Sequence, residues 1–231
     1  MTRRILYCAN QNPKVSFGQY TYNSGKISAM DVPTNYIDLL DPKWRGKLIL
    51  TYPNDDDAIA YLFSIIVSKY GFTWLSRLAQ QDVQWVRGTA TPFLLLSQAI
   101  ANTSSHRALS FTTTQLQGFS PLIQSKAPLQ EEYMSWYQSM AIFQSTKCPE
   151  SAKLFESWIL SDEWQAPLSE VSNTVLTHLN TLSGREVFKS NTTQVDGFRE
   201  FMRDRAGVEW WRVQFESMLG PPVGGNPNSL Y

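Results

Sequence analysis

The residues best suited to bind a charged ligand lie in the loop that begins at Arg87. Arg87 offers a guanidinium, and Gly88 and Thr89 offer backbone N–H groups. Thr91 and Pro92 follow as a predicted N-cap and first helical residue, so the loop leads into a helix. A helix N-terminus attracts anions because its N–H groups are unpaired and the helix dipole is positive there. We predict that this loop binds an anionic group. The alternative is that Thr91 only caps its helix and Arg87 is a solvent-exposed charge.

A second candidate is the turn at residues 54–57, Asn-Asp-Asp-Asp, which precedes another predicted helix. Its three carboxylates would repel an anion and favour an amine or a cation. Aspartate is also common at a helix start, because it interacts favourably with the helix dipole. Ligand contact by Asn54 and Asp57 is therefore one reading of this turn, and helix capping is the other.

The sequence shows no pattern of catalytic or metal-binding residues. His106 and His178 have no neighbouring nucleophile signature, no serine stands in a G-x-S-x-G elbow, and no phosphate-binding loop is present. The cysteines and histidines lack the spacing of zinc ligands. We therefore predict no catalytic residues, no metal and no cofactor. Cys8 and Cys148 either pair in an oxidising compartment or stay reduced, and both readings stand.

Composition narrows the class of partner. The 231 residues include 20 Lys and Arg against 20 Asp and Glu, with 42% hydrophobic residues, which suits a globular core. A balanced charge argues against nucleic-acid binding, which depends on neutralising phosphates. No run approaches the ~18 apolar residues of a membrane helix, and the apolar run after Met1 is too short for a secretory signal. We expect a small polar or anionic solute as partner, with no nucleic acid and no membrane insertion.

Hydrophobic periodicity and turn residues predict alternating strands and helices. Short apolar runs rich in strand formers indicate strands, and apolar residues at helical spacing between caps indicate helices. The predicted strands are residues 47–52, 83–86, 108–114 and 133–143. The first predicted helix follows the three aspartates at 55–57 and ends near Gly71. Further helices are predicted at residues 72–80 and 93–101, from Pro149 onward, and at residues 196–206 and 208–219.

Three segments carry longer motifs: YIDLLDPKWRGKL at residues 36–48, VRGTAT at 86–91 and AKLFESWILSDEWQ at 152–165. In this order they resemble the ABC-transporter extracellular solute-binding proteins of the periplasmic-binding-protein type II fold, in the branch that includes ferric iron and thiamine binders. The resemblance covers residues 18–165. Beyond residue 187 the chain looks more like fungal relatives of that family than like its bacterial members.

The resemblance implies an α/β, periplasmic-binding-protein-like II fold: two α/β lobes joined by crossing strands, with lobe one incomplete. Residues 17–23 look like the family strand that precedes the crossover, so Met1 would fall inside the expected fold. The implied boundaries are a residual lobe-one strand and crossover at 1–33, lobe two at 34–107, a return to lobe one with C-terminal helices at 108–206, and a terminal helix with a flexible tail at 207–231. We also expect strands near Tyr20, 110–113 and 133–143 to share the lobe-one sheet.

The resemblance also implies a function, namely non-catalytic capture of a small anionic or zwitterionic ligand in the interlobe cleft. The ferric branch uses adjacent tyrosines where the chain returns to lobe one, and Phe111 stands there instead, so iron binding is not expected. The implied contacts are Arg87, Gly88 and Thr89 from the loop, Asn54 and Asp57 from the acidic turn, and the hydroxyls of Thr112 and Thr113, for which ordinary strand structure is an equal account.

The implied partner is a membrane transporter, and the implied location is extracellular; a chain that truly starts at Met1 would instead be cytoplasmic. Two alternatives stand beside the solute-binding protein. One is an enzyme recruited on the same scaffold, for which Asp57 facing Arg87 is the titratable pair that the sequence offers. The other is a non-functional fragment. All three share lobe two.

Overall fold

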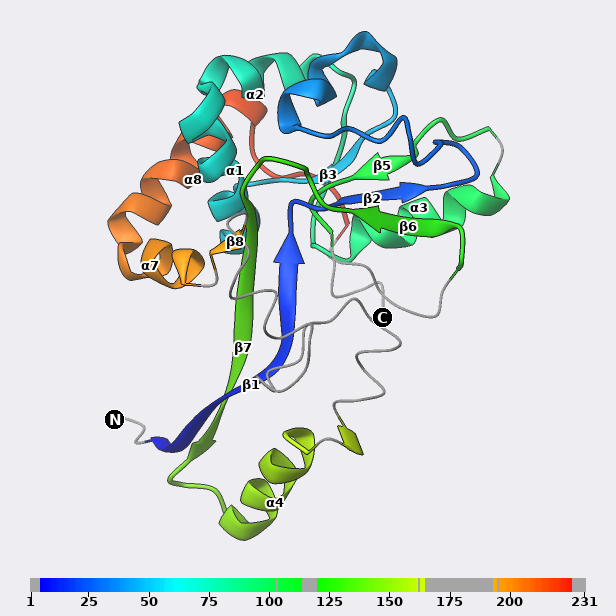
Figure 1. Ribbon diagram of the computed structural model, residues 1–231. Helices are drawn as coiled ribbons and strands as arrows, with labels where there is room; N and C mark the ends of the chain where they lie inside the picture. Colours follow the sequence, from blue (N-terminus) through cyan, green and yellow to red (C-terminus); the bar gives the residue numbers. More distant parts are fainter. Residues whose placement is uncertain are drawn as a thin grey trace. The chain divides into compact units, whose positions relative to one another are not determined.

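The structure, a computed structural model, describes residues 5–102, 104–113, 120–161, 163–164, 193–194 and 196–225. The chain forms two compact units: the first unit is Met1–Val15 with Ser135–Ser190, and the second unit is Ser16–Met134 with Asn191–Tyr231. Strands and helices alternate along the chain (Figure 1), which confirms the predicted α/β class. Residues 34–107 lie within the second unit. The finer boundaries stay a prediction, and residues 226–231 of the predicted tail lie outside the described residues.

The parallel pair β3 (Ile49–Thr51) and β4 (Gln84–Val86) forms one sheet of the second unit. Ile49 lies opposite Gln84 and Thr51 opposite Val86. Between these strands the chain runs through α1 (Asp57–Tyr70) and α2 (Phe72–Ala79), and after β4 it enters α3 (Thr91–Ala101). Two 3₁₀ helices, η1 (Tyr36–Leu40) and η2 (Pro42–Trp44), precede β3. The strand–helix–helix–strand–helix order predicted for this segment is confirmed.

A second, antiparallel sheet has the order β5 (Leu109–Ser110), β2 (Tyr20–Asn23) and β6 (Ile123–Lys126). Thr21 of β2 lies opposite Ser110 on one side and Ser125 on the other. The third sheet has the order β1 (Ile5–Phe17), β7 (Tyr133–Phe143) and β8 (Thr193–Gln194). We expected one lobe-one sheet to contain Tyr20, residues 110–113 and residues 133–143, and this expectation is wrong. Tyr20 on β2 and Ser110 on β5 share the sheet with β6, whereas β7, which covers residues 133–143, pairs with β1 and β8 in a different sheet.

The remaining described helices lie in the predicted helical segments, but the break between the last two is at Asp204 and not between residues 206 and 208 as predicted. α4 (Pro149–Ile159) lies in the first unit and begins with proline, as expected from its N-terminal residues. α7 (Gly197–Arg203) and α8 (Arg205–Leu219) follow in the second unit, and Asp204 separates them by capping α8 through the N–H of Gly207 at 3.0 Å. α8 ends at Gly220, whose φ of 79° is a left-handed conformation that favours glycine.

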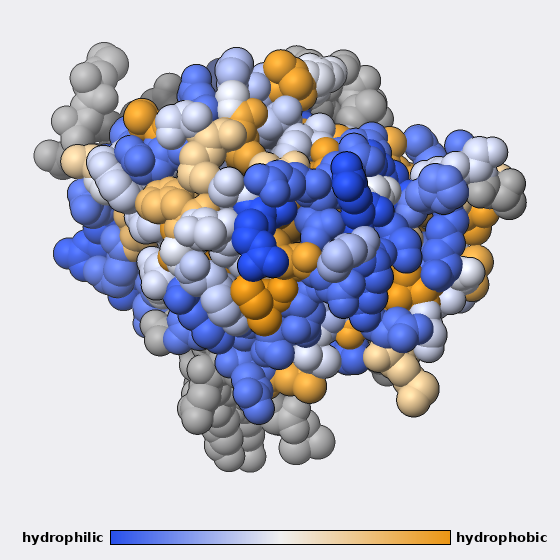
Figure 2. All heavy atoms as spheres, turned by 90° about the horizontal axis from the view of Figure 1, so that it is seen from above, coloured by the Kyte–Doolittle hydropathy of each residue, from blue (hydrophilic) through white to orange (hydrophobic). Residues whose placement is uncertain are grey.

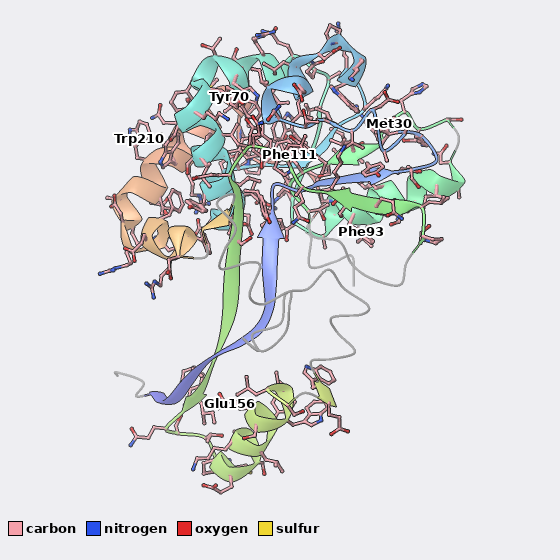
Figure 3. The ribbon with its side chains drawn as sticks, viewed as in Figure 1. Met30, Tyr70, Phe93, Phe111, Glu156 and Trp210 are labelled. Atoms are coloured by element: carbon pink, nitrogen blue, oxygen red, sulfur yellow. The ribbon has the colours of Figure 1, made fainter. Side chains whose placement is uncertain are left out.

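An aromatic cluster forms the centre of the second unit. The ring of Phe63 on α1 is fully buried, and its centroid lies 5.6 Å from that of Phe111 and 6.0 Å from that of Phe215 on α8. The rings of Trp74 on α2 and Trp85 on β4 lie at 6.0 and 6.2 Å. Phe111 is fully buried, and Figure 3 labels it among the helices and strands of this unit. Aromatic pairs in such arrangements add about 0.5–1.5 kcal/mol each beyond the area they bury, so this cluster ties three helices to a sheet.

Hydrophobic residues on the face shown in Figure 2 form small patches set among hydrophilic side chains. Among the described residues, no single helix is long and apolar enough to cross a membrane. The helices α1 and α2 reach that length and composition only when taken together, and they are bent by 113° at their junction.

Asp56 begins α1, as the predicted capping of this helix requires. Its Oδ1 accepts hydrogen bonds from the N–H groups of Ala58 at 2.9 Å and Ile59 at 3.1 Å. Burial raises the pKa of Asp56 above its ordinary value of 3.8, and the two backbone hydrogen bonds oppose that rise without cancelling it. The charge on this capping carboxylate is therefore unfavourable to the folded state.

We expect Asp56→Asn to gain stability relative to the parent as pH rises from about 3 to 7, measured by urea unfolding at each pH. The folded chain holds the proton of Asp56 more tightly than the unfolded chain, so ionisation destabilises the fold. That cost is absent below the unfolded pKa and complete above the raised folded pKa. Asparagine caps helices as well as aspartate does. Asp31→Asn, at an exposed position, controls for the lost charge. A stability difference independent of pH would contradict the prediction.

Candidate functional site

The loop from Arg87 to Ala90 connects β4 to α3 and is held by threonine hydroxyls. Gly88 has a φ of 77°, the left-handed conformation that favours glycine, and its carbonyl accepts from the hydroxyl of Thr51 at 3.1 Å. The hydroxyl of Thr91 donates to the carbonyl of Arg87 at 2.6 Å. The predicted N-cap role of Thr91 is wrong by one position, because Ala90 is the N-cap and makes no side-chain bond. The hydroxyl of Thr91 fixes the loop instead.

Arg87 and Gly88 together hold a carboxylate, and that carboxylate belongs to Asp55. The Nε of Arg87 donates to Oδ1 of Asp55 at 2.9 Å, and the N–H of Gly88 donates to Oδ2 at 3.2 Å. The side chain of Arg87 is 38% exposed and that of Asp55 is 11% exposed. Within the described part of the chain, the two Nη groups of Arg87 make no hydrogen bond. The predicted anion donors of Arg87 and Gly88 thus lie together, and the carboxylate of Asp55 from the acidic turn occupies them.

The three aspartates of the acidic turn have separate partners. Asp55 pairs with Arg87, and Asp56 caps α1. Asp57 pairs with two arginines of α8: its Oδ2 lies 2.9 Å from Arg205 and its Oδ1 lies 3.5 Å from Arg212. The hydrogen bond to Asp57 raises the pKa of Arg205. The turn is therefore balanced by arginines and is not a free acidic cluster.

Asn54 is also joined to the end of the chain's last helix. Its Nδ2 donates to the backbone carbonyl of Gly220 at 3.1 Å, and its backbone carbonyl accepts from the guanidinium of Arg212 at 3.0 Å. Its Oδ1 is buried and has no hydrogen-bond partner among the described residues. The turn thus rests on α8, which positions residues 54–57 at the start of α1.

Thr112 and Thr113 lie next to the same loop but inside the protein. The Oγ1 of Thr112 accepts from the N–H of Thr51 at 2.8 Å, and the hydroxyl of Thr113 donates to the carbonyl of Thr89 at 2.7 Å. Both residues are buried. They tie the segment after β5 to β3 and to the loop, so the structure brings them to the site in structural roles.

Sequence reasoning missed Asp55 as the partner of Arg87, and it missed Arg205 and Arg212 altogether. The two arginines stand seven residues apart, so they share one face of α8, and this spacing was visible in the sequence. The pair expected for an enzyme, Asp57 facing Arg87, is not formed, because Asp55 takes Arg87 and α8 takes Asp57.

Other chemistry-bearing residues lie apart from this site. His106 is exposed, and Cys148 is exposed and free, while His178 and the side chain of Cys8 lie outside the described residues. Within the described ranges, no group of three His, Cys, Asp or Glu side chains comes together that could hold a metal ion.

No protein-family model matches the chain, and no curated protein sequence matches it. Solved structures do. The substrate binding protein of the ABC transporter from Agrobacterium tumefaciens matches with a TM-score of 0.67 at 11% identity, over 90% of this chain and 66% of that one. A periplasmic thiamin binding protein matches with a TM-score of 0.62 at 15% identity, over 90% of this chain and 65% of that one.

A third match is iron-bound HitA from Pseudomonas aeruginosa, with a TM-score of 0.52 at 16% identity, over 90% of this chain and 70% of that one. The chain therefore has the α/β fold of these substrate-binding proteins, which confirms the predicted periplasmic-binding-protein-like class. It spans about two thirds of the length of the first two.

We expect Arg212→Ala to lower the free energy of unfolding by about 1–2 kcal/mol, because it removes the bond to Asn54 and one charge partner of Asp57. The effect is small because the side chain of Arg212 is 34% exposed and solvent screens its charge. Urea unfolding measures the change. Arg203→Ala, whose side chain is 73% exposed and pairs with Glu200, is the control and should cost less than about 0.5 kcal/mol. Equal effects of the two variants would show that Arg212 does not hold the acidic turn.

Proposed function

We propose that this chain is a solute-binding protein, or a truncated descendant of one, that captures a small anionic or zwitterionic ligand without chemical conversion. One observation carries the proposal: Arg87 and Gly88 already bind a carboxylate through two hydrogen bonds. A planar guanidinium beside a backbone N–H is a donor set suited to carboxylate or phosphonate oxygens. The fold supports the proposal, because the solved structures that match it are substrate-binding proteins.

A ligand can use these donors in two ways. A purely anionic ligand must compete with Asp55 for the Nε of Arg87 and the N–H of Gly88. A zwitterionic ligand can place its anionic group on Arg87 and its ammonium on Asp55, so it keeps both charges paired. Thr89 adds its N–H at the same loop.

The other predicted contacts have weaker support as direct ligand groups. Asp57, Thr112 and Thr113 make internal bonds that hold the turn and the loop, which favours a supporting role for them. Asn54 keeps a buried Oδ1 that can accept a hydrogen bond, so it stays a proposed contact.

The proposal extends to partner, location and origin. If this chain retains the role named for the matched structures, its partner is a membrane transporter and it acts outside the cytoplasm. A fungal origin agrees with the motif resemblance beyond residue 187. Catalysis has less support, because the titratable pair that the enzyme alternative required is not formed.

We expect Arg87→Ala to weaken binding of the best ligand in a panel of amino acids, phosphonates, thiamine and ferric citrate by roughly ten- to a hundredfold. Loss of a charge-assisted hydrogen bond costs about 1.5–3 kcal/mol, which corresponds to that range. Isothermal titration calorimetry measures the change, and Arg77→Ala at an exposed position on α2 is the control. The assignment of the site fails if Arg87→Ala binds as tightly as the parent, or if ferric ion alone binds tightly.

Asp55→Asn separates the two ligand classes. Removing the competing charge should tighten binding of a purely anionic phosphonate by roughly tenfold, about 1.4 kcal/mol. A zwitterionic amino acid should gain less or lose affinity, because its ammonium loses a partner. The same calorimetric panel provides the measurement, with Asp31→Asn as the charge control. An unchanged affinity for every ligand would mean that Asp55 and the ligand do not share donors.

A further inference from the structure

A cavity lies in the second unit, lined by none of the residues of the Arg87 loop. It has a volume of about 580 Å³ and opens beside the C-terminal half of α1. Its walls come from α1 between Tyr61 and Lys69, from η1 at Tyr36, and from residues 130–132. All lining residues belong to the second unit. We name this cavity the Glu131 pocket. Lys69, at its far end, stands twelve residues after Asp57, or ~18 Å along the helix from the acidic turn at 1.5 Å per residue.

A buried carboxylate forms the polar end of the Glu131 pocket. The side chain of Glu131 is 1% exposed, and its Oε1 accepts from the ammonium of Lys69 at 3.0 Å. Oε1 also accepts from the hydroxyl of Tyr70, and Oε2 accepts from the backbone N–H of Tyr36. The carboxylate is thus fixed by two donors that do not depend on Lys69. Figure 3 shows Tyr70 on the ribbon of α1.

The ion pair with Lys69 shows that the carboxylate of Glu131 accepts an ammonium group. The hydrogen bond to Glu131 raises the pKa of Lys69, so the pair strongly favours the protonated amine. The side chain of Lys69 is 52% exposed on a flexible four-carbon stem. It can turn into solvent and leave its position on Oε1 to another ammonium, while Tyr70 and Tyr36 keep Glu131 in place.

The rest of the lining suits the body of an organic cation. Tyr61 and Ile65 of α1 are half-buried and line the cavity, and they offer aromatic and aliphatic surface. Glu132 also lines the cavity. The volume lies within the range of ordinary small-molecule sites.

We propose that the Glu131 pocket binds a small primary amine with an apolar body. The ammonium takes the position of Lys69 on Glu131, and the body lies against Tyr61 and Ile65. This site is separate from the Arg87 loop and takes a ligand of opposite charge. It does not depend on the proposed function, because all of its groups lie elsewhere in the second unit.

The test uses 2-phenylethylamine as probe, with 2-phenylethanol and 3-phenylpropionate as the neutral and anionic analogues. Protein-observed NMR on the full chain measures binding and locates it through the amide shifts of α1 and residues 130–132. We expect the amine to bind in about the millimolar range, typical of so small a ligand, and both analogues to bind at least roughly tenfold more weakly. Equal binding of the alcohol, or no binding of the amine, would overturn the proposal.

Two variants sharpen the test. Ser68→Trp adds a large side chain at an exposed position that lines the cavity, and should abolish amine binding. Ser76→Trp on the exposed face of α2 is the matched control and should leave it unchanged. Lys69→Ala removes the competing ammonium and should tighten amine binding several-fold. Amine binding that survives Ser68→Trp, or that weakens in Lys69→Ala, contradicts the assignment. Arg87→Ala should leave amine binding intact, so failure at the Arg87 loop and failure here are distinguishable.

Discussion

The packing of Phe63 is the interaction on which the rest of the second unit depends. Its ring contacts aromatic rings from α2, β4, α8 and the segment after β5, so one residue of α1 fixes that helix against four other parts of the chain. Close-packed protein interiors have low compressibility. Both ends of α1 are consequently held in place, with the acidic turn at the N-terminal end and the Glu131 pocket beside the C-terminal half.

Charge pairing then decides what each end of α1 can bind. The acidic turn contains three aspartates in sequence, yet Asp55 and Asp57 are paired with arginines and Asp56 accepts from backbone N–H groups. Because Asp55 occupies the donors that a ligand anion would use, the proposed binding would exchange one carboxylate for another and would not be a simple addition. The internal pair would then reduce the affinity for a plain anion, whereas a zwitterion would satisfy both Arg87 and Asp55.

Local features of the fold could be predicted from the sequence, and long-range pairings could not. The limits of α1 are set by Asp56 at its N-cap and Gly71 at its C-cap, and these capping roles depend on residues that are close in the chain. The pairing of Thr21 with both Ser110 and Ser125 depends on strands distant in the chain, for which hydrophobic periodicity carries no signal. The same holds for the candidate site: the loop that contains Arg87 and Gly88 could be predicted from neighbouring residues, but the choice of Asp55 over Asp57 as their partner depends on how α8 lies against the turn.

The dipole of α1 acts with opposite sign on the acidic turn at one end of the helix, which pairs with the Arg87 loop, and on the Glu131 pocket toward the other end. Its N-terminal end is partially positive and its C-terminal end is partially negative, so groups near the first turn favour anions and groups near the last turn favour cations. Lys69 stands in the last turn, where its ammonium interacts favourably with both the dipole and Glu131. An amine that replaces Lys69 on Glu131 would enter the same favourable field, while the Arg87 loop lies beside the acidic turn that starts the helix. The polarity of the helix therefore agrees with the ligand charge inferred at each end.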